Sequence, residues 1–357
     1  MEEAHRQSRK PPFPECQALL EKGGLPGRAR LFPLPGGANN RVYRVEVDQG
    51  SYLLKAYFQH PLDLRDRLGV EYAFTSFAWE NGLRCVPRPL GIDRTRRLGL
   101  YEFVQGRPIR SGEITEEMVM QAVEFYRGLN RHRESFQAKA LPKASEACFS
   151  MADHLACVKR RLDLLRSSVP ALDDLHEEAL AFVRDDLSEA WESTAEFLLA
   201  ESRRLGISVQ EEIPSEESRL SPSDFGFHNA LLENNGRIRF IDFEYAGWDD
   251  PAKTACDFFC LQGVPAPEAT CDRFVEGLAG DLPRPSLYFE RVRLLFPVHR
   301  IKWCCILLND FLPLGAQRRS FAREENGLEE RKGLQLAKAR SALETVRQRF
   351  QKARIYP

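Results

Sequence analysis

A short segment that carries two aspartates and an asparagine constrains the fold of this chain more than any other. Asp224 and Asn229 lie five residues apart, and Asp242 follows Asn229 by thirteen residues. The apolar segments 230–232 and 238–241 predict two strands, and the Asn-Gly pair between them predicts a hairpin, because this pair readily adopts positive φ angles. The hairpin returns Asp242 to the neighbourhood of Asn229. The sequence therefore predicts two oxygen ligands at one end of a small β-ribbon.

These residue types suit one kind of chemistry. Magnesium prefers hard oxygen ligands, which Asn229 and Asp242 both supply. Phosphoryl transfer from ATP needs such a metal site, together with a further carboxylate that orients the attacking hydroxyl. We therefore expect Asn229 and Asp242 to hold Mg²⁺ and Asp224 to act as the catalytic base.

The wider segment carries a family resemblance. Asp224-x-x-x-x-Asn229, followed by Ile-Asp-Phe-Glu-Tyr-Ala-Gly-Trp-Asp-Asp-Pro-Ala at 241–252, resembles the aminoglycoside phosphotransferase and choline kinase family. The resemblance runs from about residue 31 to about residue 257. It implies an α+β, bilobal protein-kinase-like fold, with an N-lobe of antiparallel sheet plus helix over 1–105 and a mostly helical C-lobe over 106–357. It also implies ATP as cofactor and a small-molecule hydroxyl as acceptor.

A nucleotide-binding loop is predicted near the N-terminus. The sequence around Gly36, Gly37 and Ala38 is typical of a strand, a glycine-rich turn and a second strand. Glycines let the backbone approach phosphates closely, and the amides of the turn can donate to them. The resemblance implies that Asn39 and Asn40 belong to the same nucleotide-positioning loop.

Further nucleotide contacts are implied by the resemblance. Lys55 lies in a predicted strand and would pair with ATP phosphates and with Glu71, which opens the following amphipathic run. The segment that ends at Glu102, Phe103 and Val104 resembles the hinge whose backbone holds the adenine. In order along the chain, these residues match the parts of a kinase nucleotide site.

The catalytic loop departs from the family pattern. Pro222 and Gly226 stand where the family usually has histidines, and we expect Pro222 to stiffen the loop by fixing φ. His228 is expected to be packed or solvated. Thr254 replaces a usual aspartate, and we expect Asp257, one helical turn later, to anchor the catalytic loop.

Length and composition bear on the size of the core, on possible partners and on the location of the protein. A chain of 357 residues is long enough to bury large cores. A net charge of −1 indicates no nucleic-acid partner, and no apolar run reaches the ~20 residues that span a bilayer. The first ten residues do not resemble a signal peptide. Nine cysteines without a Cys-x-x-Cys pair favour reduced thiols and a cytoplasmic location. The oligomeric state stays open.

Helical patterns dominate the rest of the chain. Helices are predicted over 114–132, 146–167, 175–205 with a break, 291–309 and 335–354. Pro297 should either kink the fourth helix or mark its start, because it lacks the N–H that a helix interior requires.

The identity of the phosphate acceptor is the part of the function that the sequence determines least. A hydroxyl of a sugar or amino sugar is our first expectation, and an aminoglycoside or a choline-like amino alcohol is the alternative. A third possibility is an ATP-binding pseudokinase with a regulatory or scaffold role. The intact Lys55, Asp224, Asn229 and Asp242 argue against it. A protein kinase is disfavoured by the lack of His-Arg-Asp and Ala-Pro-Glu. Candidate acceptor residues are Trp248, Asp249, Asp250, His299, Arg300, Lys302, Trp303 and Asp310.

Overall fold

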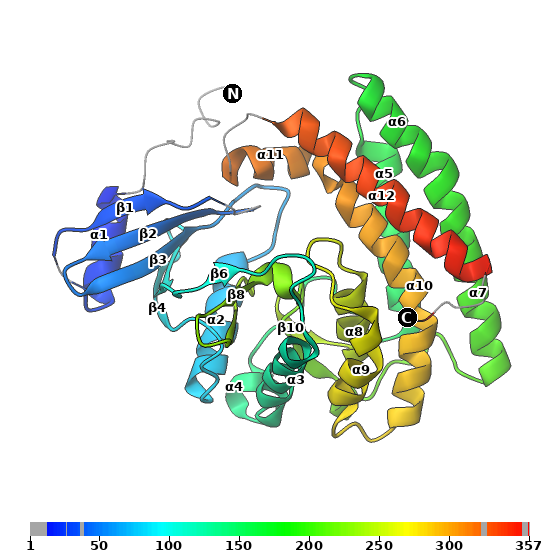
Figure 1. Cartoon of the computed structure of the whole chain (residues 1–357), viewed down its shortest axis with the longest axis horizontal. Helices are drawn as coiled ribbons and strands as arrows, with labels where there is room; N and C mark the ends of the chain where they lie inside the picture. Colours follow the sequence, from blue (N-terminus) through cyan, green and yellow to red (C-terminus); the bar gives the residue numbers. More distant parts are fainter. Residues whose placement is uncertain (1–12, 26, 36–38, 323–326, 352–355, 357) are drawn as a thin grey trace.

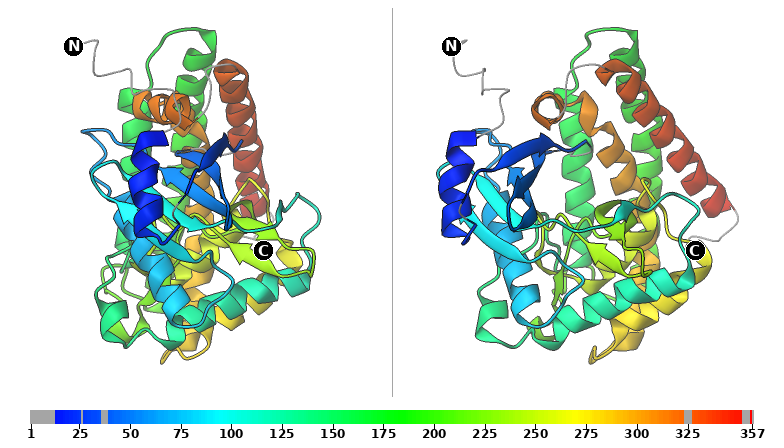
Figure 2. Two further views of the ribbon diagram at one scale, coloured as in Figure 1. Left: turned by 90° about the vertical axis from the view of Figure 1, so that its left-hand side faces the viewer. Right: turned by 60° about the vertical axis from the view of Figure 1, so that its left-hand side comes forward.

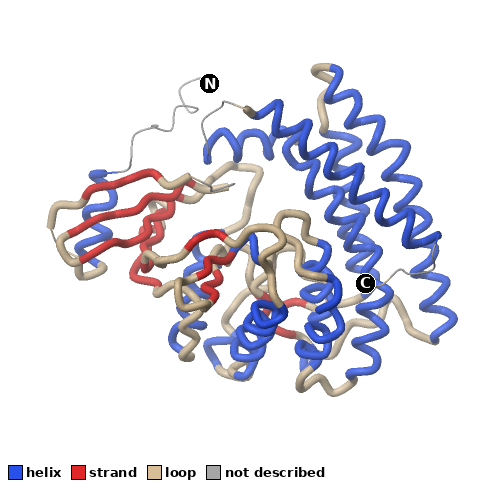
Figure 3. The backbone as a smooth tube through the Cα atoms, viewed as in Figure 1, coloured by secondary structure: helices blue, strands red, loops and turns tan. Residues whose placement is uncertain are grey.

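A five-stranded sheet near the N-terminus lies beside a larger, mostly helical part (Figures 1 and 2). The computed structural model describes residues 13–25, 27–35, 39–322, 327–351 and 356. Figure 3 shows the five-stranded sheet in the first part and most helices, with the shorter strands, in the second. This arrangement is the predicted bilobal α+β fold, and the predicted boundary at 105/106 falls between strands β5 and β6.

The N-lobe sheet is antiparallel throughout, with strand order β1-β2-β3-β5-β4. Its strands are β1 (Arg30–Pro33), β2 (Arg41–Val47), β3 (Gly50–Ala56), β4 (Pro89–Asp93) and β5 (Leu98–Glu102). Successive side chains of a strand point to opposite faces. Leu54 of β3 therefore joins the small core under α1, while its neighbour Lys55 faces α2.

Two helices cover this sheet. Helix α2 (Arg67–Glu80) carries Glu71 and is capped by Asp66, whose carboxylate accepts a hydrogen bond from the amide of Gly69. Helix α1 (Phe13–Lys22) packs Leu19 and Leu20 on the other face, in a segment for which the sequence pattern did not predict a helix.

The predicted catalytic ribbon is present. Strands β8 (Ala230–Leu232) and β9 (Ile238–Phe240) form the expected hairpin, and β6 (Arg107–Pro108) pairs with β8. The turn is closed by a hydrogen bond from the amide of Gly236, at φ 82°, to the carbonyl of Glu233. Strands β7 (Arg219–Ser221) and β10 (Gly247–Asp249) pair with each other, and the catalytic loop and the hairpin lie between them in the sequence.

The C-lobe is built around α10, which packs against α5, α7, α8 and α12 (Figure 1). Its helices are α3 (Glu116–Arg131), α4 (Phe136–Lys139), α5 (Met151–Ser168), α6 (Asp174–Phe182), η2 (Val183–Leu187), α7 (Ser188–Leu205), η3 (Ser215–Glu217), η4 (Phe227–Asn229), α8 (Pro251–Cys260), η5 (Glu268–Thr270), α9 (Cys271–Ala279), α10 (Pro285–Leu307), η6 (Leu308–Phe311), α11 (Pro313–Ala322) and α12 (Leu328–Gln351). None of the described helices combines the length and apolar character needed to cross a bilayer.

Four predicted helices differ from those observed, and the last of them begins at Leu328 rather than at 335. The second begins at Met151, where Ser150 caps it, rather than at 146. The expected break within 175–205 is a π-helical turn that joins α6 to α7 without a stop. Pro297 neither starts nor ends α10, which begins at Pro285 and continues through it.

Candidate active site

The catalytic loop holds Asp224 in an unusual backbone conformation. Ser223 and Asp224 have φ angles of 49° and 33°, which residues other than glycine rarely adopt. The Asn229 amide nitrogen donates to the backbone carbonyl of Asp224 at 3.0 Å and to its carboxylate at 3.3 Å. His228 Nε2 lies 3.3 Å from the other carboxylate oxygen. The loop therefore wraps around the carboxylate that the sequence predicted as the base.

His228 is better placed than the sequence suggested. It is expected to be packed or solvated, with contact to substrate or phosphate as the alternative, and its ring packs against Asp224. A Cβ at Gly226 would lie only 3.1 Å from His228 Nδ1, so the missing side chain at 226 leaves room for the His228 ring. The absence of a histidine at 226 and its presence two residues later are the signal in the sequence that could have indicated this contact.

The loop is anchored through Ser221. The Ser221 hydroxyl accepts a hydrogen bond from the amide of Ser223 at 3.1 Å and contacts the Thr254 hydroxyl at 2.9 Å. The prediction that Asp257 anchors the loop is wrong. Asp257 accepts hydrogen bonds from His299, Lys302 and Trp303 of α10 instead, because its side chain turns toward that helix. Thr254 makes the anchoring contact at the position where the family has an aspartate.

Asp242 lies where β9 ends and meets the N-lobe. Its φ is 67°, and Lys55 Nζ lies 2.5 Å from its carboxylate. The same ammonium donates to Glu71 at 2.6 Å, so the predicted Lys55–Glu71 pair is present. The Tyr57 hydroxyl also donates to Glu71, at 2.7 Å. Tyr57 was not singled out in the sequence, although it lies two residues after Lys55 and so faces the same side of the chain.

Burial and neighbouring charges set the ionisation of these groups. Burial opposes ionisation of Asp224, but His228 and Asn229 outweigh it, and the pKa of Asp224 lies below its usual value. Burial raises the pKa of Asp242; Lys55 opposes this rise and Glu244 adds to it, so the net pKa is raised. Burial lowers the pKa of Lys55, but the charges of Asp242 and Glu71 raise it by more. The net pKa lies well above its usual value, so the ammonium stays charged.

Glu244 links the two lobes and was missed by the sequence interpretation. It is fully buried and accepts hydrogen bonds from Asn39 at 2.8 Å, Asn40 at 2.6 Å and Arg67 at 2.9 Å. The side-chain amides of Asn39 and Asn40, predicted to position the nucleotide, thus donate to this carboxylate. Glu244 stands two residues after Asp242 in the Asp-Phe-Glu motif, which is the signal that could have identified it.

The remaining predicted nucleotide contacts fall into two groups. Gly36, Gly37 and Ala38 lie outside the described residues. Phe103 and Val104 follow β5, and neither forms a backbone hydrogen bond with another residue that the structure describes. Their N–H and C=O groups therefore lack a backbone partner among these residues, and Val104 itself is buried. The Glu102 side chain accepts from Arg239 at 2.8 Å and from the amide of Arg88 at 2.9 Å, which fixes the start of this segment.

Comparison with known proteins assigns the family. A model of the phosphotransferase enzyme family matches residues 31–288. The chain belongs to this family. No curated protein matches it in sequence. The family confirms the expected enzyme class, an ATP-dependent phosphotransferase with an alcohol group of a small molecule as acceptor.

Solved structures share the fold of this phosphotransferase. A spectinomycin phosphotransferase in complex with ADP and spectinomycin has a TM-score of 0.57 at 12% identity, covering 94% of this chain and 98% of that chain. A choline/ethanolamine kinase family protein from Mesorhizobium loti has a TM-score of 0.53 at 18% identity, covering 93% and 94%. An ADP-bound aminoglycoside phosphotransferase has a TM-score of 0.53 at 15% identity, covering 91% and 97%. The predicted protein-kinase-like fold is thereby confirmed.

The candidate acceptor residues of this phosphotransferase are engaged with other residues of the C-lobe. Asp249 accepts from Lys253 at 2.7 Å, and Asp250 pairs with Arg291 and with His154. Asp310 pairs with Arg319 and Arg331, and Arg300 contacts Glu268 at 3.4 Å. His299, Lys302 and Trp303 all bind Asp257, and the Trp248 indole donates to the Ala138 carbonyl. Each of these carboxylates already has a basic partner.

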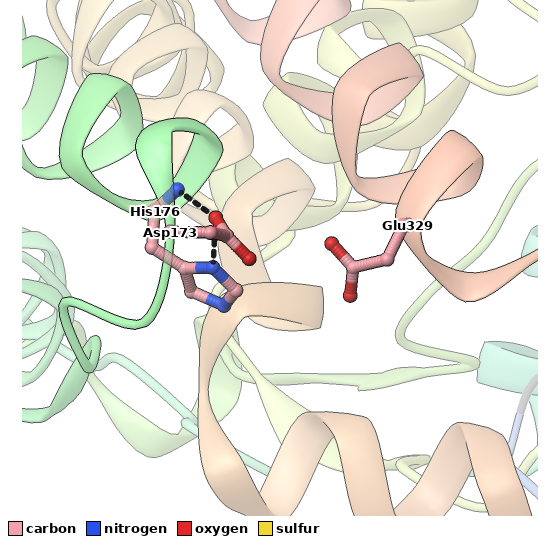
Figure 4. A group of neighbouring side chains, drawn as sticks. All are labelled: Asp173, His176 and Glu329. Carbon is pink, nitrogen blue, oxygen red and sulfur yellow. Dashed lines mark hydrogen bonds and ion pairs between the residues drawn. The ribbon is translucent and has the colours of Figure 1, made fainter.

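A second group of possible metal ligands lies between α6 and α12 (Figure 4). Asp173 accepts from His176 Nδ1 at 2.7 Å, and Glu329 faces the pair from α12. Lys332 Nζ lies 3.3 Å from His176 Nε2 and 2.7 Å from Glu329. An ammonium group therefore already bridges these residues, as a cation would, and the group joins two helices.

Proposed function

We propose that this phosphotransferase moves the γ-phosphate of ATP to a hydroxyl of a sugar or amino sugar. Asp224 is the base, and Asn229 and Asp242 are the ligands of Mg²⁺. The observation that carries the proposal is the meeting of Lys55 from β3 with Asp242 from the catalytic ribbon, while Asn229 contacts Asp224. One residue of each required kind thus lies at one site.

The residues present fit a magnesium ion. The Asn229 amide nitrogen is engaged by Asp224, which leaves the amide oxygen as the group that can bind a metal. Glu71, Asp242 and Glu244 offer carboxylate oxygens within 4.8 Å of one another, with Lys55 as a cation among them. Such a site attracts a further positive charge. When bound, Mg²⁺ would neutralise charge on the phosphates.

The other residues act on the two substrates. Lys55, held by Glu71 and Tyr57, would pair with the phosphates, and the backbone groups of Phe103 and Val104 would receive the adenine. The lowered pKa keeps Asp224 ionised at neutral pH, so that its carboxylate can accept a hydrogen bond from the attacking hydroxyl. These intact parts favour catalysis over a pseudokinase. Residues 1–105 would then hold the nucleotide and 106–357 the acceptor.

The proposed acceptor class follows from the charges of the C-lobe. Relatives of the same fold include a spectinomycin phosphotransferase and choline or ethanolamine kinases. A cationic acceptor of either kind is best bound by unpaired carboxylates. Asp249, Asp250, Asp257 and Asp310 each pair with a basic side chain instead. This pairing favours a neutral sugar over cationic acceptors, which include aminoglycosides, amino alcohols and, to the extent of its one amine, an amino sugar. We place the reaction in the cytoplasm, where ATP and reduced thiols are available.

A turnover screen tests this proposal. ADP release is measured with ATP, MgCl₂ and panels of sugars, amino sugars, amino alcohols and aminoglycosides. Asp242→Ala serves as the matched inactive control, since it removes one metal ligand. We expect a sugar or amino sugar to give the highest kcat/KM and Asp242→Ala to abolish the reaction. A preference for amino alcohols or aminoglycosides would contradict the acceptor class. Equal ADP release by both proteins would contradict the site.

A further inference from the structure

Helix α11 reaches from the C-lobe to the N-lobe beside the phosphate end of the proposed site (Figure 1). Arg41 Nε donates to the carbonyl of Phe321 at 2.7 Å. Arg319 donates to the side chain of Asn39 at 3.1 Å. These contacts place the helix next to residues 39–41, at the end of the glycine-rich turn, rather than next to the hinge at 102–104.

Arg318 of α11 lies among basic side chains. The positive charges of Arg67, Arg65 and Arg319 act against its own charge, and the Tyr245 hydroxyl acts in its favour. Burial and these neighbours hold the pKa of Arg318 below its usual value. Its Nε is buried and has no hydrogen-bond partner, and no ion pair joins its side chain to any part of the chain that the structure describes.

The other arginines of this cluster have carboxylate partners. Arg65 pairs with Asp63 at 2.6 Å. Arg67 pairs with Asp63 at 2.7 Å and with Glu244 at 2.9 Å. Arg319 pairs with Asp310 at 2.9 Å. Arg318 is therefore a surplus positive charge in a partly buried place.

A partly buried cation among like charges costs folding free energy, and an anion beside it offsets that cost. A guanidinium presents its N–H groups as a planar fork that matches phosphate and carboxylate. Arg318 therefore has the chemistry of a subsite for an anionic group of a ligand.

We propose that Arg318 binds a phosphate or carboxylate group carried by the acceptor, so that the preferred acceptor is a sugar phosphate or a sugar acid. This inference rests on the proposed function and narrows its acceptor. We assign this anionic group to the acceptor rather than to ATP, because Lys55 and the proposed metal site would already bind the nucleotide phosphates. Contacts in the same cluster lead toward the metal site: Arg67 donates to the Tyr245 hydroxyl at 2.9 Å and pairs with Glu244, whose carboxylate lies within 4.8 Å of that of Asp242.

Kinetics with matched acceptors test the subsite. Glucosamine 6-phosphate is compared with glucosamine, and glucuronate with glucose, in the wild type, Arg318→Ala and Arg318→Lys. The control is Arg340→Ala, which removes an exposed arginine of α12 paired with Glu178. We expect the wild type to favour an anionic acceptor over its neutral counterpart at least tenfold in kcat/KM. Arg318→Ala should lose that preference through KM, Arg318→Lys should keep part of it, and Arg340→Ala should keep all of it.

Three results would overturn the inference. One is a wild-type enzyme that prefers the neutral member of each pair. Another is an Arg318→Ala variant with an unchanged preference. The third is a tenfold rise in KM for ATP in Arg318→Ala, which would assign Arg318 to the nucleotide. If Arg318→Ala does not fold, Arg318→Lys carries the same comparisons.

A binding measurement separates this inference from the proposed function. Inorganic phosphate is titrated into the enzyme saturated with ADP and MgCl₂, and binding is measured by calorimetry. This measurement needs no turnover. We expect binding by the wild type and Arg340→Ala, and at least tenfold weaker binding by Arg318→Ala. Phosphate binding that depends on Arg318 without turnover of any acceptor would refute the proposed function alone. Equal phosphate binding by all three proteins would refute the subsite alone.

Discussion

At the scale of single residues, the proposed site stores backbone strain. Ser223, Asp224 and Asp242 all have positive φ angles, and residues other than glycine adopt them at a cost of about 1–3 kcal/mol each. The surrounding hydrogen bonds hold them there. Ser221 fixes the amide of Ser223, and Asn229 fixes the carbonyl of Asp224. The structure thus holds two carboxylates in fixed positions before any ligand binds.

The residues of the Lys55 cluster should contribute unequally to activity. Lys55→Ala removes the group that would pair with the phosphates and leaves Glu71 and Asp242 without a shared cation. Glu71→Gln retains a hydrogen-bonding group for Lys55 and Tyr57. We expect Lys55→Ala to lower kcat/KM for ATP at least tenfold more than Glu71→Gln does. Steady-state kinetics over a range of ATP concentrations provide the measurement. Equal losses would show that Glu71 does more than position Lys55.

The sequence predicts Asp224, Asn229 and Asp242 from their spacing along the chain, and the family resemblance implies Lys55 and Glu71. Lys55, Glu71, Asp224, Asn229 and Asp242 were all predicted, and the structure brings them into two contacting groups. The partners that complete the groups depend on contacts across the fold. Asn39 and Asn40 meet Glu244 across more than 200 residues, a pairing that no local pattern reveals.

At the scale of elements, two glycines in the strands and turns around the catalytic loop have different roles. Gly236 closes the β8–β9 hairpin at φ 82°, and a Cβ there would meet nothing within 4 Å. Gly247 in β10 packs against the segment 142–144, and a Cβ there would lie 2.3 Å from the Pro142 carbonyl oxygen. The first glycine serves backbone conformation, and the second serves close packing.

Alanine substitutions should separate these roles. Gly236→Ala should lower the free energy of unfolding by about 1–2 kcal/mol, the cost of a left-handed residue, with kcat unchanged. Gly247→Ala should be more damaging, because its clash breaks the hydrogen bonds between Trp248 and the 142–144 segment. Thermal unfolding and turnover are measured for both variants. A Gly247→Ala protein as stable as Gly236→Ala would contradict this packing.

Element prediction succeeded where periodicity is strong and failed where tertiary contacts decide. The hairpin and the helix at 116–131 follow from local pattern. The interior position of Pro297 does not, because the surrounding helices α5, α7, α8 and α12 hold α10 together across it. Helix α1 owes its place to the sheet face that it covers.

At the scale of the whole molecule, a buried polar network joins the helices behind the site. Asp257 of α8 binds His299, Lys302 and Trp303 of α10, and His299 contacts His154 of α5 at 3.0 Å. Burial, with Lys302 adding to its effect, lowers the pKa of His299 to about 3, although Asp257 opposes the change. His299 is therefore neutral in the folded protein at neutral pH.

This network predicts how stability depends on pH. Between about pH 3 and the usual histidine value of about 6.5, unfolded His299 binds a proton that the folded protein excludes, so stability falls as pH falls. The loss should be about 1.4 kcal/mol for each pH unit below about 6.5. Denaturant unfolding at pH 7.5 and 5.0 should show a loss about 2 kcal/mol smaller in His299→Gln than in the wild type. Equal losses would contradict a neutral, buried His299.

The central claim, that Asp224 orients the attacking hydroxyl, is tested most directly by Asp224→Asn. The variant keeps the size of the side chain and removes its charge. With the best acceptor of the screen, we predict a fall in kcat of about 10²–10⁴, the usual contribution of a general base, and an unchanged Kd for ADP with MgCl₂. Asp163→Asn, an exposed aspartate of α5 paired with Lys159, should behave as the wild type. Wild-type kcat in Asp224→Asn would contradict the account.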